Sequence, residues 1–376
     1  MKNILGVIRW VVGLLFIFSG LIKANDPLGL SYKMQEFFEV WNMPFFDDYT
    51  LALSVLMIAF EIIAGVAVIV GYRMKLVSWL LLLLILFFTF LTAYALFSGK
   101  IKTCGSFGDC IPLTVQTSFI KDLILLVLIL ILFYYRNRMK TFVSPKASIA
   151  VLLAATVFSF GIQWYVLVHL PVLDCLPYKK GNNISEKMKV PAGAVPDSSV
   201  ITFVYQKQGK EVEFTADKFP ADFNDTAYTF LKRYDKVVRE GNAEPPIKDF
   251  VLNTPDGIDS TQEILATPGY MLLLFVKDEW NGAGYMEQLE LIRIRANEKR
   301  IPLHLVTNNK QLAEKFKIGR REKASRPDKA LLCDGVAIKT AARVNPTIYL
   351  LQHGTVTGKW SGADFDETVK ILEKLN

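Results

Sequence analysis

Long apolar segments in the first 170 residues limit, more than any other feature, how this chain folds. Residues 77–97 read VSWLLLLLILFFTFLTAYALF and contain no charged side chain. A helix needs about 20 mainly apolar residues to cross a bilayer. Segments of about that length lie at residues 4–22, 51–70, 77–97, 118–135 and 148–169. The sequence therefore predicts an α-helical membrane bundle of about five transmembrane helices that is surrounded by membrane lipid.

The distribution of basic residues predicts the direction in which these helices cross the membrane. Loops on the cytoplasmic side usually carry more Lys and Arg than loops on the outer side. With a cytoplasmic N-terminus, the inner side holds Lys2, Arg73, Lys75, Arg136, Arg138, Lys140 and Lys146, and the outer loops hold only Lys23, Lys33, Lys100 and Lys102. We therefore expect an inner (cytoplasmic) membrane protein whose residues after His169 lie in the periplasm. The net charge of +7 partly reflects this topology, and without a nucleic-acid-binding motif it predicts no nucleic-acid partner.

The cysteines of the chain all lie on the outer side, or at its membrane surface, in this topology. They are Cys104, Cys110, Cys175 and Cys333. Disulfides form and persist in a periplasm, and the sequence does not choose among the three possible pairings. Gly105 and Gly108 allow a sharp turn, so Cys104 and Cys110 can meet, either as an exchanging pair or as a fixed clip. Cys175 leaves the fifth span at a similar depth and can resolve a mixed disulfide or pair permanently with either.

A carboxylate lies near the middle of the second predicted span. Glu61 would be costly in lipid, so it is a functional-site candidate for a proton path or for binding a quinone head group. The alternative is a packing role, in which Glu61 pairs with Lys121, Arg9 or a hydroxyl group. The sequence therefore indicates a quinone as the candidate cofactor. The three histidines show no metal-ligand spacing, and we expect no metal site.

The residues after the fifth span follow a different pattern. Residues 171–244 predict a periplasmic linker that contains a β-hairpin, VITFVYQKQGKEVEFTADKF, followed by a polar stretch. In residues 245–376, β-rich runs such as YMLLLFV and IPLHLVT alternate with amphipathic helices such as GYMEQLELIRIRANEKR. That alternation predicts an α/β domain of ordinary size.

The membrane half resembles the DoxX/MauE family of redox-associated membrane proteins over residues 1–140, with residues 141–170 as an additional fifth helix. The residues that carry the resemblance are Ser19, Gly20, Lys23, Asp26, Pro27, Gly29, Tyr32, Lys33, Glu36, Glu61 and the loop CGSFGDCIPLT. The layout is more loosely similar to the vitamin K epoxide reductase bundle, which passes electrons between cysteines and a quinone. A common form of the family's loop reads Cys-Gly-Cys-Phe-Gly, whereas this chain has Ser106 at the middle position.

The outer half resembles the thioredoxin-like domains of the TlpA and ResA type over residues 245–376. Those domains present Trp-Cys-x-x-Cys at a helix start, and here Trp280 precedes Asn281 and Gly284 at the two cysteine positions. Pro346 occupies the position of the family's cis-proline. Without thiols a CxxC-type redox cycle is impossible. The resemblance therefore implies a degenerate groove around these four residues that binds an extended peptide, or a domain that is only structural.

Together these features predict a redox-associated protein that supports thiol–disulfide handling in the periplasm. In this interpretation Cys104 and Cys110 exchange, Cys175 is a third partner, and the outer domain binds a periplasmic client or a thiol oxidoreductase. The alternative is a non-enzymatic scaffold or assembly factor for secreted or envelope proteins, in which the cysteines are structural. A third hypothesis is a small-molecule site around Glu61 without a thiol step. Whether the protein is an enzyme stays open at this point.

Overall fold

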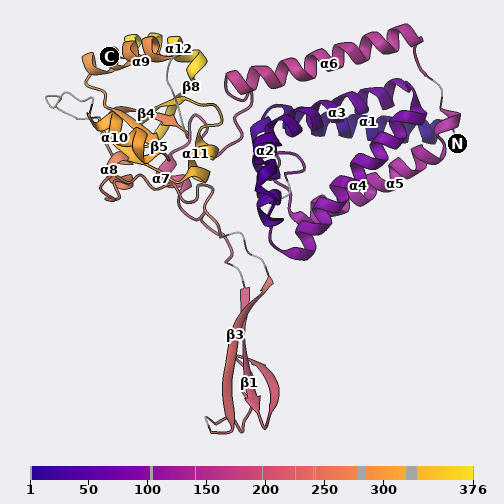
Figure 1. The fold of residues 1–376 in the computed structure, drawn as a ribbon, viewed down its shortest axis with the longest axis horizontal. Helices are drawn as coiled ribbons and strands as arrows, with labels where there is room; N and C mark the ends of the chain where they lie inside the picture. The colour runs from indigo at the N-terminus through magenta and orange to yellow at the C-terminus, as the bar shows by residue number, and fades with distance from the viewer. Residues whose placement is uncertain are drawn as a thin grey trace.

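The computed structural model describes residues 2–101, 105–139, 141–196, 198–224, 226–239, 241, 243–277, 284–318 and 328–375. Within these ranges it contains a helical bundle, a projecting β-arm and a compact α/β domain (Figure 1). Trp280, Asn281 and Cys104 lie outside the described residues.

The predicted apolar helices are confirmed. In the described part of the chain, five helices are long and apolar enough to cross a membrane: α1 (Lys2–Ala24), α3 (Thr50–Val70), α4 (Met74–Ser98), α5 (Val115–Tyr134) and α6 (Pro145–Val168). Many of their side chains face outward and are apolar, as a helix surrounded by lipid requires. Two short 3-10 helices, η1 (Pro44–Tyr49) and η2 (Arg136–Arg138), lie in the loops between spans.

A further helix, α2 (Pro27–Val40), follows α1 and runs across one end of the bundle (Figure 1). The side chain of Asp26 caps it by accepting a hydrogen bond from the backbone N–H of Gly29, and Pro27 occupies its first turn. This cap fixes the direction in which the chain leaves α1. It also places Asp26 at the outer surface of the bundle, next to the α/β domain.

The helices α1 and α3 approach each other closely because two glycines face each other across the contact. A Cβ atom added at Gly13 would lie 2.9 Å from the carbonyl oxygen of Gly65, and one added at Gly65 would lie 2.7 Å from that of Gly13. Small residues at such a contact allow two membrane helices to pack backbone against backbone. Around it, Val12, Phe16 and Val68 belong to the buried apolar core of the bundle.

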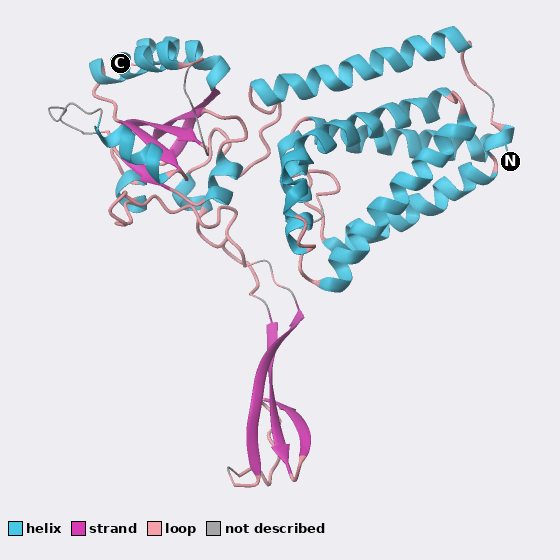
Figure 2. Cartoon of the chain, in the orientation of Figure 1, coloured by secondary structure: helices cyan, strands magenta, loops and turns pink. Residues whose placement is uncertain are grey.

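The β-arm consists of three antiparallel strands in the order β2-β1-β3. They are β1 (Ser198–Lys207), β2 (Lys210–Thr215) and β3 (Tyr228–Arg239), and Figure 2 shows them projecting away from both other parts. The expected hairpin is present as β1 and β2, but β3 replaces the polar stretch expected after it. The sequence YTFLKRYDKVVR hides this strand because only part of one face is apolar, where Tyr228 and Phe230 pack against Tyr205.

The C-terminal domain has a mixed sheet in the order β6-β5-β4-β7-β8 across the described residues. Its strands are β4 (Tyr270–Val276), β5 (Leu303–Thr307), β6 (Ala330–Leu332), β7 (Thr347–Gln352) and β8 (Thr355–Ser361). Its helices are α7 (Ile184–Lys187), α8 (Thr261–Leu265), α9 (Met286–Glu298), α10 (Lys310–Ile318), α11 (Gly335–Ala341) and α12 (Phe365–Lys374), with a 3-10 turn η3 (Gly362–Asp364) before the last.

The strand directions identify the type of fold. β4 and β5 are parallel and joined through α9, whereas β4 with β7 and β7 with β8 are antiparallel. The peptide bond between Asn345 and Pro346, directly before β7, is cis. This is the layout of a thioredoxin-like domain, so the predicted fold of this half, and the expected cis-proline, are confirmed.

We expect the replacement of Gly65 by Leu to destabilise the bundle, because its side chain would overlap the backbone of α1. Overpacking of this kind costs about 1–3 kcal/mol, so the thermal unfolding midpoint in detergent should fall. Gly161→Leu in α6 is the matched control, since no atom lies within 4 Å of the added Cβ position. An unchanged midpoint for Gly65→Leu would contradict the close packing of α1 and α3.

Candidate functional site

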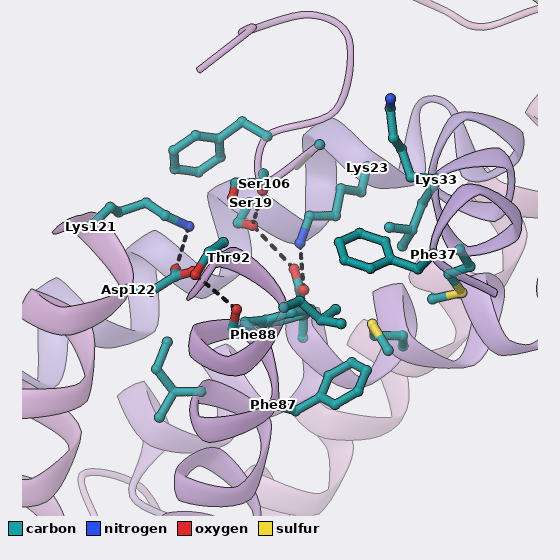
Figure 3. Close-up of a pocket in the computed structure, with 18 of the residues that line it drawn as sticks. Ser19, Lys23, Lys33, Phe37, Phe87, Phe88, Thr92, Ser106, Lys121 and Asp122 are labelled. Carbon is teal, nitrogen blue, oxygen red and sulfur yellow. Dashed lines mark hydrogen bonds and ion pairs between the residues drawn. The ribbon is translucent and has the colours of Figure 1, made fainter. Parts of the chain in front are cut away.

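A cavity of about 200 Å³ lies inside the membrane bundle. Helices α1 to α5 line it together with Gly105, Ser106 and Phe107 of the loop that carries Cys110. Most of the lining is aromatic or aliphatic, including Phe37, Phe88 and Trp41. Figure 3 shows Ser19, Lys23, Thr92, Ser106, Lys121 and Asp122 around the same space. An apolar cavity with a few converging polar groups is the usual form of a small-molecule site.

The first polar group of the cavity is an ion pair between Lys23 and Glu61. Lys23 Nζ lies 2.6 Å from Glu61 Oε1, and both side chains are almost completely buried. The Ser19 hydroxyl is within hydrogen-bond distance of Glu61 Oε2 at 3.2 Å and of the Ser106 carbonyl oxygen at 3.3 Å. Glu61 therefore has a cationic partner, which offsets much of the free-energy cost of burying its charge away from water.

The partner of Glu61 differs from two of those expected from the sequence. Lys121 pairs with the neighbouring Asp122 at 2.9 Å, and Arg9 donates to the carbonyl oxygens of Val68 and Ile69. The long apolar stem of Lys23 allows its ammonium group to turn inward from the end of α1. The expected hydroxyl contact is present, through Ser19.

The second polar group of the cavity surrounds Asp122 on α5. Thr92 of α4 donates a hydrogen bond of 3.1 Å to Asp122 Oδ2, while Lys121 Nζ approaches Oδ1 (Figure 3). Lys121 Nζ also lies 5.0 Å from the ring centroid of Phe107. The two ion pairs thus supply both positive and negative atoms at the cavity wall, and sequence reasoning had missed the role of Thr92 and Asp122.

The structure joins Cys110 to Cys175, one of the pairings that the sequence left open. The favoured pair, Cys104 with Cys110, is not the one formed, because the loop turns Cys110 toward the segment that follows α6. The Cα atoms of Cys110 and Cys175 are 4.9 Å apart. Asn25, at the end of α1, holds that segment with two hydrogen bonds to the backbone of Leu173, at 2.8 and 2.9 Å.

The thioredoxin-like domain contacts one end of the bundle through charged side chains. Arg343 Nε donates to Asp26 Oδ2 at 2.8 Å, and its Nη2 pairs with Asp109. Lys359 Nζ lies 2.9 Å from Asp174 Oδ2. These contacts join residues that are far apart in the sequence, and no local sequence pattern predicts them.

The pKa values at this contact reflect how deeply it is buried. Burial alone would lower the pKa of Arg343, but Asp26 and Asp109 together raise it. Burial raises the pKa of Asp26 more than Arg343 lowers it. Burial lowers the pKa of Lys359, and Asp174 offsets this only in part. The ion pairs therefore hold charges that water does not screen well, and each side depends on the other.

Two further contacts link the bundle and the domain. Lys277, at the end of β4, donates to the Arg343 carbonyl oxygen at 2.9 Å and lies 3.2 Å from the Tyr32 hydroxyl. His169 Nδ1, at the end of α6, lies 2.7 Å from Asp364 Oδ1. Helix α2 and the end of α6 thus both reach the domain.

Of the four residues expected to form a peptide groove, Gly284 and Pro346 are described, whereas Trp280 and Asn281 lie outside the described residues. Pro346 is buried beside Gly362 and Tyr285. The side-chain amide of Asn345 accepts a hydrogen bond from the backbone N–H of Lys277 and donates one to its carbonyl oxygen. Gly284 is exposed. Arg343, three residues before Pro346, faces the membrane bundle. The surface next to the cis-proline is therefore in contact with this chain's own membrane half.

Residues 1–135 match the family of methylamine utilisation protein MauE. This match confirms the predicted resemblance of the membrane half to MauE, and residues 1–135 are called the MauE-like half below. Residues 199–240, which form the β-arm, match a family described as a domain of unknown function, DUF8463.

Among solved structures, the chain has some likeness to BsSco, a member of the Sco family of cytochrome c oxidase assembly proteins. The sequences are 12% identical, the TM-score is 0.26, and the likeness covers 34% of this chain and 91% of that chain. A search of curated proteins gives no match. The chain therefore combines a MauE-like half, with helices long and apolar enough to cross a membrane, and a thioredoxin-like domain.

Cys333 is the remaining cysteine among the described residues, and it is not disulfide-bonded. It is buried in the core of the thioredoxin-like domain. Burial, and then the neighbouring charge of Asp334, raise its pKa to about 12. It is therefore a small core residue and not a reactive thiolate. Across the described ranges no cluster of three or more His, Cys, Asp or Glu could hold a metal ion.

We expect Glu61→Gln and Lys23→Met each to destabilise the MauE-like half, because each leaves the other ion buried without its partner. The loss from breaking a buried pair is about 3–5 kcal/mol. The double variant Lys23→Met/Glu61→Gln removes both charges and should be more stable than either single variant. Unfolding midpoints in detergent give the double-mutant cycle. Additive losses would contradict a direct pairing.

We expect Cys333 to react slowly with maleimide in the folded protein at pH 8. A thiol with a pKa of about 12 is about a thousandfold less ionised there than an ordinary cysteine, and only the thiolate attacks. Labelling of Cys333 should become fast in denaturant, which mass spectrometry of the labelled peptide would detect. Rapid labelling of the folded chain would contradict this assignment.

Proposed function

We propose that this protein carries out thiol–disulfide exchange at the outer face of the membrane, with Cys110–Cys175 as its exchanging disulfide. The observation that carries the proposal is the position of one short loop. Gly105, Ser106 and Phe107 line the membrane cavity, and Cys110, three residues further, forms the disulfide. A redox-active group in the cavity would therefore lie on one side of this loop, and a client outside the membrane would reach the disulfide from the other side.

The exchange reaction balances between the disulfide and a client that has two thiols. A client thiolate attacks one sulfur of the Cys110–Cys175 bond and forms a mixed disulfide, which the second client thiol resolves. The client loses two electrons and two protons in total, and Cys110 and Cys175 receive them as two thiols. A periplasmic protein or a thiol oxidoreductase is the class of partner that fits this step.

The cavity residues fit a quinone. The polar atoms of Lys23, Glu61 and Ser19 would hold a ring that carries carbonyl groups, and the aromatic lining would surround its apolar parts. When bound, a quinone supplies an acceptor for two electrons and two protons. Glu61 and Lys23 can each hold a proton inside the bundle, where water is scarce. Cys104 directly precedes Gly105 of the cavity wall, so we assign it the role of third thiol.

The location that supports this chemistry is an inner membrane with the thioredoxin-like domain in the periplasm. The excess of basic residues on the opposite side favours that orientation, and an oxidising compartment allows the disulfide to persist.

A second candidate function is a scaffold in which Cys110–Cys175 is structural. The disulfide joins residues 65 positions apart and ties the loop before α5 to the segment after α6, as a staple would. The thioredoxin-like domain, without cysteines at positions 281 and 284, also fits a role in binding without chemistry.

Thiol trapping in intact membranes distinguishes the two functions. Cells that express the full chain, or Cys110→Ser, Cys175→Ser and Cys104→Ser variants, are quenched in acid and alkylated with a mass-shifting maleimide. We expect Cys110 and Cys175 to be partly reduced, and to shift toward the oxidised form when a short-chain benzoquinone is added. Cys333→Ser is the matched control and should behave as wild type.

An oxidised pair that neither mild reductant nor quinone changes would overturn the exchange function and favour the scaffold. Protein abundance, measured on the same samples, separates loss of chemistry from loss of folding.

A further inference from the structure

The residue before each cysteine of the disulfide is an aspartate. Asp109 precedes Cys110, and Asp174 precedes Cys175. Each aspartate pairs with a cation of the thioredoxin-like domain, Asp109 with Arg343 and Asp174 with Lys359. One folded domain therefore holds the chain on both sides of the same S–S bond.

Both cations are buried and are held by their own domain. Their side chains are each only 5% exposed. Arg343 Nη1 donates to the Lys339 carbonyl oxygen of α11 at 2.9 Å, while its Nε binds Asp26. Lys359 lies on β8, beside Tyr349 of β7, with its Nζ 5.3 Å from that ring's centroid. The sheet and α11 thus present the two cations from fixed positions.

These ion pairs are formed by the residues that precede the cysteines and not by the cysteines themselves. A buried cation that loses a carboxylate partner is disfavoured, so we expect Lys359 to keep Asp174 when the disulfide opens. Arg343 stays anchored by Asp26 and can keep its pair with Asp109, whose side chain is 41% exposed. The backbones of the adjacent cysteines are then held near the 4.9 Å Cα separation that a disulfide requires. Two thiols kept in this way react as though each were present at high local concentration.

We propose that the thioredoxin-like domain is a clamp for the Cys110–Cys175 pair, in which Arg343 and Lys359 are positioning residues. The domain's partner is this chain's own membrane half, which the clamp holds through Asp109 and Asp174. The inference rests on the proposed exchange function. It gives the domain a role in that reaction although it has no cysteine at positions 281 and 284.

The step that the clamp favours is the closing of a mixed disulfide. When Cys175 is bonded to a small thiol such as glutathione, the Cys110 thiolate attacks the Cys175 sulfur. The Cys110–Cys175 bond forms, the bond to glutathione breaks, and glutathione leaves as a thiolate. No further oxidant is needed, because the mixed disulfide and the Cys110–Cys175 disulfide are at the same oxidation level.

The test is a redox equilibrium of the purified full chain in detergent, over a series of reduced-to-oxidised glutathione ratios. Mass-shifting alkylation gives the fraction of protein in which Cys110 and Cys175 are reduced at each glutathione ratio. From this fraction we obtain the effective concentration of the Cys110 thiol relative to the Cys175 thiol. We expect Arg343→Met and Lys359→Met each to lower this effective concentration about tenfold, and the double variant about a hundredfold. Lys329→Met removes an exposed ion pair with Glu263 in the same domain and should leave it unchanged.

Variants on the membrane side and conservative variants separate clamping from general damage to the fold. Asp109→Asn and Asp174→Asn should lower the effective concentration as the cation variants do. Lys359→Arg keeps the charge and should restore most of it. Circular dichroism and the unfolding midpoint of each variant show whether it is folded.

The outcomes distinguish this inference from the function on which it rests. A wild-type disulfide that glutathione does not open at any ratio would overturn the exchange function and the clamp together. A wild-type disulfide that opens, with folded Arg343→Met/Lys359→Met variants at the wild-type effective concentration, would overturn the clamp alone. If the double variant does not fold, unchanged effective concentrations for Asp109→Asn and Asp174→Asn would overturn the clamp in its place.

Discussion

The Arg343 guanidinium, buried between Asp26 and Asp109, is the interaction on which the relation of the two halves depends. Asp26 also caps α2, so the ion pair reaches the helix that crosses the outer end of the bundle. Asp109 belongs to the loop that closes the cavity and carries Cys110. One side chain of the thioredoxin-like domain therefore connects the start of α2, the cavity loop and the disulfide. Because Arg343 and Asp26 are largely removed from water, their pairing is specific: a buried charge tolerates few other partners.

The membrane half and the thioredoxin-like domain would contribute different features to the proposed exchange. The cavity offers buried ion pairs and aromatic walls but, among the described residues, no cysteine lines it. The thioredoxin-like domain has the fold of a thiol oxidoreductase but carries asparagine and glycine at positions 281 and 284. The disulfide lies between these two parts, at their contact. Position 106, where the family's common loop has a cysteine, contributes a serine whose carbonyl oxygen faces Ser19 at the cavity.

Much of the fold follows from local patterns. Apolar length predicted the five long helices, and the alternation of β-rich and amphipathic runs predicted the α/β domain. The third strand of the arm was missed because charged residues interrupt its apolar face. In the candidate site, the sequence indicated Glu61 because an intramembrane carboxylate is rare, but it did not indicate Lys23 as its partner. A lysine at the end of a span usually turns toward the surface, and only the packed bundle shows that this one turns inward.

The sequence by itself determined the number and place of the long apolar helices, the type of the outer domain and the absence of cysteines at positions 281 and 284. These properties depend on segment length, on period and on the chemistry of single residues. Only the tertiary structure decided that Cys110 bonds to Cys175 and that Arg343 and Lys359 hold the aspartates beside them. Such pairs join residues 65 to more than 200 positions apart, and which charges share a buried contact depends on how whole helices and sheets pack.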